Sequence, residues 1–237
     1  MQSFGKTVSD ISQVGQGPAE GDSSEPDSML KNTIKSVYFG EIVRQVQAAK
    51  MSADLLNSAL AAASADAEEQ LAVVFFAAQG MLTAGALVSK ILWMSQPQRP
   101  DGCRCPQLPS EKEKAMRAKR RCKELRDELG IKDQMQELSS RRVRNAFEHF
   151  DDRIDTFFAD GNTWYFDRIV GPSNTVVVRN EGIDRAVKYM RRFDPEKVEL
   201  SVLDDSISLQ ALLDALDDIG IRAQRWLDTN LPGSKVR

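Results

Sequence analysis

A chain of 237 residues, 41% of them hydrophobic and 28% charged, has the composition of a globular protein with a buried core. Its net charge of −3 excludes nucleic-acid binding through a global positive field, so such a partner would have to contact a local basic patch. Three cysteines and no secretory signal pattern predict a cytoplasmic protein.

The first half of the chain is predicted to be helical after an irregular start. Residues 1–28 are rich in Gly, Ser, Asp, Glu and Gln and hold no apolar run, which predicts a disordered tail. From Met29 to about Ala63, apolar residues return every three or four positions, which predicts a long amphipathic helix. A second helix is predicted to begin after Ser64 and to run to about Met94.

The core of the second helix, Leu71 to Ser89, contains no charged residue. That length is about what a membrane span requires. Its polar residues, its glycines and its many alanines favour instead a central helix that is surrounded by other helices. We therefore expect no membrane contact, with a membrane anchor through this helix as the alternative.

Basic residues are densest in the next predicted helix, which follows a proline-rich loop at residues 96–109. The candidate RNA-binding residues there are Lys112, Lys114, Arg117, Lys119, Arg120, Arg121 and Lys123. They form either a solvated face with i,i+4 charge pairs or a surface that contacts phosphates. In the loop, a single residue separates Cys103 from Cys105, which is not the usual zinc-ligand spacing, and we expect neither a metal site nor a cofactor.

The segment from Glu137 to Phe158 is predicted to be a helix with one apolar face, and it carries His149, the only histidine of the chain. Asn145 precedes His149 by four residues and lies on the same side of a regular helix. Arg144 precedes it by five residues, so the two side chains diverge by about 140°. A phosphate site that uses both needs an irregular helix start or a second copy of the chain.

Short segments bounded by turn residues follow Gly161. Residues 163–170 and 175–180 flank Gly171 to Asn174, and residues 186–193 and 198–203 flank Asp194 to Lys197, which predicts two hairpins of a small antiparallel β-meander. From Ser208 the helical spacing returns, which predicts a C-terminal helix. Residues 231–237 are predicted to be a frayed tail.

The residues Arg144 to His149, RNAFEH, resemble the signature of the HEPN superfamily: an arginine, a polar residue that is often asparagine, and a histidine a few residues later on a late helix of a bundle. The resemblance covers about residues 29–160. It implies a HEPN-like helical domain at residues 29–160, and with the strands predicted from the turn residues after Gly161 the whole chain is expected to be an α+β, mainly α protein. Residues 161–230 would then add the β-meander with the C-terminal helix packed on it.

The resemblance implies a homodimer, in which the arginine and histidine residues of two chains meet in a cleft. It also implies a metal-independent endoribonuclease that leaves a cyclic phosphate on the RNA. A toxin or defence system is the setting that this resemblance suggests. His149 would be the general acid or base, Arg144 the phosphate clamp and Asn145 the orienting residue. Asp151 stands where HEPN toxins controlled by nucleotide transfer carry a tyrosine, so that control is not expected here. The alternative is a catalytically silent HEPN-like module with a helical dimer interface, and the sequence identifies no antitoxin or regulator.

Overall fold

The computed structural model describes most of the chain from Ser24 to Leu231. The described residues are 24–62, 67–93, 109–132, 135–139, 145, 150–161, 165–172, 177–180, 183–186 and 188–231. Only the backbone is described for residues 24–31, 67, 109–112, 136, 139, 177–180 and 183–186. The protein is mainly helical with a small sheet region, which confirms the coarse fold class.

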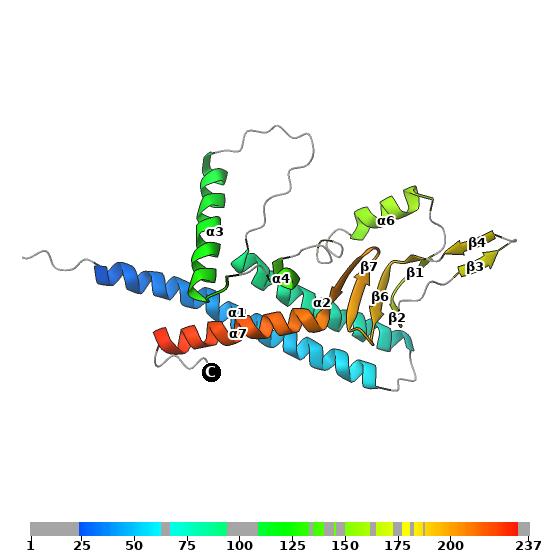
Figure 1. The fold of residues 1–237 in the computed structure, drawn as a ribbon, viewed down its shortest axis with the longest axis horizontal. Helices are drawn as coiled ribbons and strands as arrows, with labels where there is room; N and C mark the ends of the chain where they lie inside the picture. Colours follow the sequence, from blue (N-terminus) through cyan, green and yellow to red (C-terminus); the bar gives the residue numbers. More distant parts are fainter. Residues whose placement is uncertain are drawn as a thin grey trace, which may run out of the picture.

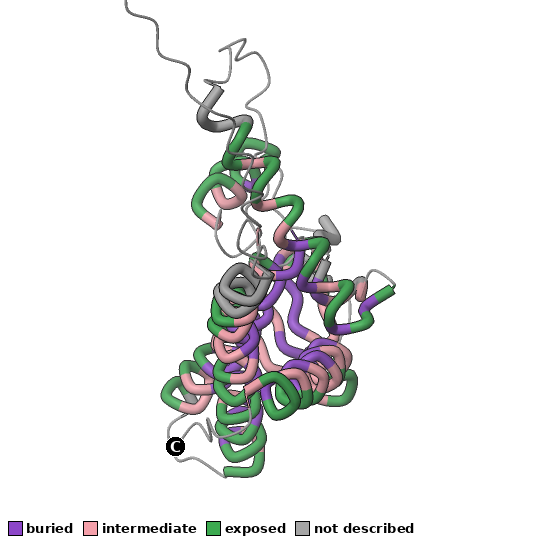
Figure 2. Tube along the Cα trace, turned by 90° about the vertical axis from the view of Figure 1, so that its left-hand side faces the viewer, coloured by how far each residue is buried: buried purple, intermediate pink, exposed green. Residues whose placement is uncertain are grey.

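Three long helices form the base of the molecule (Figure 1): α1 (Ser24–Ala61), α2 (Ala67–Leu92) and α7 (Leu209–Asn230). α1 begins inside the segment that was predicted to be a tail, and residues 1–23 lie outside the described residues. The predicted periodicity is confirmed from Phe39 onward, where the buried positions on α1 recur every three or four residues, whereas Ile34 and Val37 of the predicted apolar face are exposed. The buried positions include Phe39, Ile42, Val46, Ala49, Ala53 and Leu56. Figure 2 shows such buried positions on the facing sides of the elements, with exposed positions outside.

α7 lies close against α1 because a glycine faces a valine where the two helices meet. A Cβ atom on Gly220 would lie 3.1 Å from both Cγ atoms of Val46. The start of α7 is fixed by Ser208, whose hydroxyl accepts a hydrogen bond of 3.2 Å from the backbone nitrogen of Ala211. The predicted C-terminal helix is therefore present, and it packs mainly on α1 rather than on the sheet.

α2 occupies the centre of the helical layer, in contact with α1, α3, α4 and α7. Its most apolar 18-residue window has a mean hydropathy of 2.0, and half of that window is buried. By length and composition α2 could cross a membrane, but a core helix satisfies the same criteria. The exposed side of α2 is not wholly polar, because Phe76 on that side is 71% exposed.

α3 (Pro109–Glu128) is attached to the helical layer through its last turn and projects away from it (Figure 1). The Glu128 carboxylate accepts hydrogen bonds from Lys35 of α1 and, at 3.0 Å, from Trp226 Nε1 of α7. Gly130, with a φ of +64°, ends the helix in the left-handed region that glycine adopts without strain. One carboxylate therefore joins three helices.

Replacing Glu128 with glutamine should lower the Tm by about 2–4 °C at neutral pH, because each hydrogen bond to the carboxylate loses its charge assistance. The hydrogen bond from Lys35 holds the pKa of Glu128 below its ordinary value. A group with a lowered folded-state pKa stabilises above its unfolded-state pKa, and loses that contribution as the pH falls. Thermal scans should therefore show the difference between the two proteins shrinking below about pH 5. A difference that grows on acidification would contradict this role.

The described strands follow α6 (Phe150–Ala159) and are short. They are β1 (Tyr165–Phe166), β2 (Ile169–Val170), β3 (Val177–Asn180), β4 (Ile183–Ala186), β5 (Lys188–Tyr189), β6 (Arg191–Asp194), β7 (Glu199–Val202) and β8 (Asp205–Ser208). One sheet has the order β2-β6-β7-β8, while β1 pairs with β5 and β3 pairs with β4. The strands β6, β7 and β8 form an antiparallel meander.

The two predicted hairpins have different outcomes. The β6–β7 hairpin is confirmed, and the buried Asp194 carboxylate accepts hydrogen bonds from the backbone nitrogens of Glu196 and Lys197 in its turn. The hairpin around residues 171–174 is wrong, because β2 pairs parallel with β6 and β3 pairs antiparallel with β4. Only Glu181 and Gly182 separate β3 from β4, and a two-residue connection with glycine is the stronger hairpin signal.

The sheet shares one hydrophobic core with the helices. Phe193 of β6 and Leu200 and Val202 of β7 are fully buried in the same cluster as side chains of α1, α2 and α7. The short elements after α6 are therefore held by the helical layer, and α7 contacts both β7 and β8. The two segments that the sequence divides at residue 160 meet in this core.

Candidate functional site

The predicted catalytic segment lies between α4 (Gln136–Ser139) and α6. Arg144 and His149 lie outside the described residues, so their separation remains a prediction. Asn145 is described as helical and half-buried. Helical structure is therefore present before, within and after the motif, in agreement with the predicted helix over the described positions.

α6, which begins one residue after His149, combines a buried side with an acidic exposed side. Phe157 is buried, whereas Asp151, Asp152 and Asp155 are exposed. Carboxylates that follow a histidine so closely in the sequence favour its protonated form and repel RNA phosphates.

The basic face of α3 is largely exposed, and part of it is neutralised by neighbours on the same helix. Arg120 Nε lies 2.8 Å from Glu124, and Lys123 Nζ lies 2.8 Å from Asp127. Such i,i+4 pairs between exposed side chains contribute little and break at low cost. Lys114 and Lys119 are exposed with no ion pair to any described residue, and the side chain of Lys112 is outside the described set. The interpretation as a solvated face with charge pairs therefore fits Arg120 and Lys123. The interpretation as a surface that contacts phosphates fits Lys114 and Lys119 better.

A groove of about 900 Å³ runs between the basic face and α1. Its lining includes Lys35, Tyr38, Lys114, Arg117, Arg120 and Arg121. Arg121 differs from the rest of the basic face, because its guanidinium carbon lies 5.1 Å above the centre of the Tyr38 ring. Arg121 therefore positions α3 against α1. At the groove, Lys114 has no ion pair to a described residue, and Arg117 has only a long contact of 3.8 Å to the Glu113 carboxylate, so both cations could contact an anionic partner at low cost.

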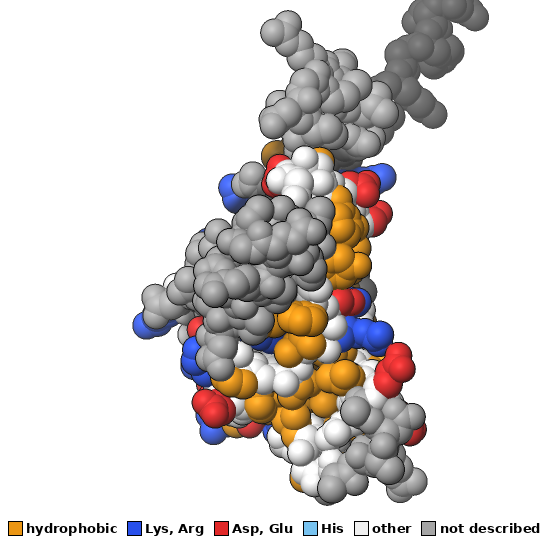
Figure 3. Space-filling view, turned by 90° about the vertical axis from the view of Figure 1, so that its right-hand side faces the viewer, with side chains coloured by type: hydrophobic (Ala, Val, Ile, Leu, Met, Phe, Trp, Pro, Cys, Tyr) orange, Lys and Arg blue, Asp and Glu red, His pale blue; other side chains and the backbone are white. Residues whose placement is uncertain are grey.

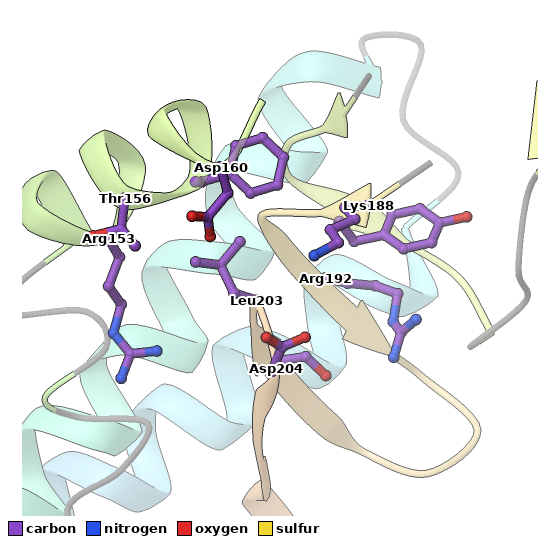
Figure 4. Close-up of a pocket in the computed structure, with 10 residues that line it drawn as sticks. Arg153, Thr156, Asp160, Lys188, Arg192, Leu203 and Asp204 are labelled. Atoms are coloured by element: carbon purple, nitrogen blue, oxygen red, sulfur yellow. The ribbon is translucent and has the colours of Figure 1, made fainter. Parts of the chain in front are cut away.

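A second cavity, of about 400 Å³, was not predicted from the sequence. It lies between α6 and the strands (Figure 4), and Arg153, Phe157, Lys188, Arg192 and Ser201 are among its lining residues. These residues come from one helix and three strands, so no sequence spacing marks them. The only available signal was alternation along each strand, which indicates faces but not which strands pair.

The cysteines form no metal site or disulfide among the described residues. Cys122 of α3 is buried as a free thiol, whereas Cys103 and Cys105 lie outside the described residues. Within the described part of the chain, no cluster of His, Cys, Asp and Glu has the arrangement of a metal site.

Comparison with known proteins adds no relative: no protein-family model, no curated protein and no solved structure matches this chain. The resemblance to the HEPN superfamily rests on Arg144, Asn145 and His149 and on the helices around them.

Proposed function

We propose that this protein is a metal-independent endoribonuclease of the HEPN type, acting in the cytoplasm as a homodimer and serving a toxin or defence system. The observation that carries the proposal is the Arg144-Asn145 pair followed four residues later by the sole histidine, in a chain segment with helical structure on both sides. The exposed basic face of α3 supports it, because RNA binding by a protein of net charge −3 needs such a local patch.

The proposed reaction is attack of a ribose 2′-hydroxyl on the adjacent phosphodiester, with departure of the 5′-oxygen of the next nucleotide. His149 takes the hydroxyl proton or gives one to the leaving oxygen, and Arg144 stabilises the charge that develops on the phosphate. Asn145 orients the imidazole from one helical turn away. The products are a cyclic phosphate and a free 5′-hydroxyl end.

The direct test is incubation of the purified protein with end-labelled RNA in excess EDTA. Cleavage that persists in EDTA and leaves a cyclic phosphate supports the proposal, because metal-dependent nucleases stop under these conditions. Absence of cleavage across structured and single-stranded RNA would contradict it. Fractionation without detergent tests the cytoplasmic location, which requires the protein in the supernatant.

Neutralising two groove cations should weaken RNA binding in a salt-dependent way. In the double variant Lys114→Gln/Arg117→Gln, the slope of log K against log salt should become shallower by about 1.4, since each phosphate contact to single-stranded RNA contributes about 0.7. Filter binding over a salt series measures the slope. The matched control, Lys90→Gln/Arg225→Gln, removes two exposed charges from α2 and α7 and should leave the slope unchanged. Equal slopes in all three proteins would show that the groove does not bind RNA.

A second candidate function is a catalytically silent HEPN-like module that assembles through the same helices. It is favoured by exposed apolar side chains on the two helices that border the groove: Ile34 and Val37 on α1, and Met116 on α3. Such side chains on charged helices are typical of a protein-binding surface. A stable dimer without any ribonuclease activity would favour this candidate.

A further inference from the structure

The cavity between α6 and the strands contains two buried polar atoms without a described partner. Arg192 of β6 and Ser201 of β7 are opposite each other in the antiparallel register, so both side chains project from the same face of the sheet. Arg192 Nε and Ser201 Oγ are buried and accept or donate no hydrogen bond among the described residues. Ser201 as a whole is 7% exposed. Buried donors of this kind are normally paired, so a missing partner indicates a place for a ligand or for water.

Arg192 differs in its surroundings from Arg153, which also lines the cavity, and from the adjacent Arg191. Arg153 lies 2.8 Å from the Asp205 carboxylate, and Arg191 Nε donates to Asp167 at 2.8 Å. Arg192 has no ion pair to a described residue, and its guanidinium carbon instead lies 5.3 Å above the centre of the Tyr189 ring. Stacking fixes the plane of a guanidinium while its edge stays free to donate two parallel hydrogen bonds.

The remaining walls of the cavity divide into charged and apolar parts. Lys188 is a second cation on the strand side, whereas Asp160 lies across the cavity, in the turn that follows α6 (Figure 4). Phe157 and Leu203 add apolar surface. Leu203 adopts a left-handed backbone with a φ of +53°, held by a hydrogen bond of 2.8 Å from its nitrogen to the Met190 oxygen. Leucine rarely adopts that conformation, and strain of this kind is concentrated at binding sites.

We propose that this cavity binds a small phosphate monoester whose body carries both apolar surface and hydroxyl or amino groups. The Arg192 guanidinium and the Ser201 hydroxyl donate to the phosphate, and Lys188 balances its second charge. Asp160 accepts from a polar group of the body, which sets the direction of the ligand, and Phe157 and Leu203 contact its apolar part. A volume of about 400 Å³ lies within the range of about 300–1,000 Å³ that is typical of small-molecule sites. The proposal does not depend on RNA cleavage.

Calorimetric titration with four probes tests the ligand class. Adenosine 5′-monophosphate and glucose 6-phosphate share a phosphate on different bodies, and adenosine lacks the phosphate. We expect adenosine 5′-monophosphate to bind at least about tenfold more tightly than adenosine, and glucose 6-phosphate to show whether the base contributes. 4-Hydroxybenzoate carries a carboxylate in place of the phosphate. If it binds more strongly than either phosphate ester, the choice of a phosphate ligand is overturned.

Two variants separate a binding role from a structural one. Arg192→Met and Ser201→Ala should each weaken binding of adenosine 5′-monophosphate, the first by at least about tenfold. Their Tm without ligand should be unchanged or higher, because each removes a buried polar group that has no partner. The matched control Arg225→Met removes an exposed arginine of α7 and should bind as wild type does.

The same titration distinguishes this cavity from the proposed catalytic segment. Binding of adenosine 5′-monophosphate should persist in His149→Ala if Arg192 and Ser201 hold the phosphate. Equal affinities of wild type and Arg192→Met, loss of binding in His149→Ala alone, or no saturation up to about 10 mM would each overturn the proposal.

Discussion

Replacing His149 with alanine is expected to reduce RNA cleavage in EDTA by about a hundredfold to ten-thousandfold. General acid–base catalysis by a positioned side chain contributes about that much, and no second histidine exists in the chain to substitute for it. Cleavage rates should be measured with saturating protein and trace labelled RNA, so that the chemical step rather than binding is compared. A variant that cleaves at the rate of wild type would remove the histidine from the mechanism.

The pH dependence provides the control against a general loss of structure. In wild type, the cleavage rate should change across the titration of an imidazole, with a pKa of about 6.5 in the absence of neighbours. Residual activity of the variant should lack that change. An unaltered Tm and an unaltered oligomeric state must accompany the loss of activity, since a general loss of structure would also abolish it.

Mixing two inactive variants tests the geometry of the motif. If each site takes Arg144 from one chain and His149 from its partner, a mixed dimer of Arg144→Ala and His149→Ala chains contains one intact site and one doubly defective site. Random mixing then restores about a quarter of the wild-type activity, because half of the dimers are mixed and half of their sites are intact. If both residues act within one chain through an irregular helix start, mixing restores nothing.

Helical periodicity allowed most of the architecture to be predicted. In α1 and α7 the apolar side chains recur at the period of the helix, and the same positions, such as Val46 and Leu216, are buried in the structure. The length of the uncharged segment from Leu71 to Ser89 could also be predicted, but whether it is surrounded by lipid or by protein could not. A membrane span and a core helix share one composition, and only the contacts of α2 with α1, α3, α4 and α7 show what surrounds it.

Strand pairing and the second cavity could not be predicted because both depend on contacts between distant segments. Ile169 pairs with Arg192 in a parallel register, and nothing in either strand specifies the other as a partner. Arg192 and Ser201 become neighbours only through the β6–β7 register, and α6 closes the cavity from another part of the chain. The sequence therefore indicated a motif with a known signature, while a site assembled from single residues of several elements stayed hidden.

The core that joins the sheet to the helices should be the most sensitive part of the molecule to truncation. We expect Phe193→Ala to lower the free energy of unfolding by about 3–5 kcal/mol, since Phe193 is fully buried and its removal leaves a cavity as well as lost apolar contact. Phe193 is paired with Leu200 on β7 and with Val170 on β2, so the surrounding strands cannot collapse into the space without losing register. This loss is large, because the free energy of unfolding of a natural protein is only about 5–15 kcal/mol.

Denaturant unfolding of Phe193→Ala and Phe76→Ala separates burial from residue type. Phe76 is the same residue on an exposed site of α2, where alanine removes little buried surface and has the higher helix propensity, so its variant should unfold within about 0.5 kcal/mol of wild type. If the sheet were an independent annex, Phe193→Ala would give two unfolding transitions. The sheet would unfold in the first, and α1, α2 and α7 would unfold only in the second. One shared core requires a single transition that is shifted as a whole.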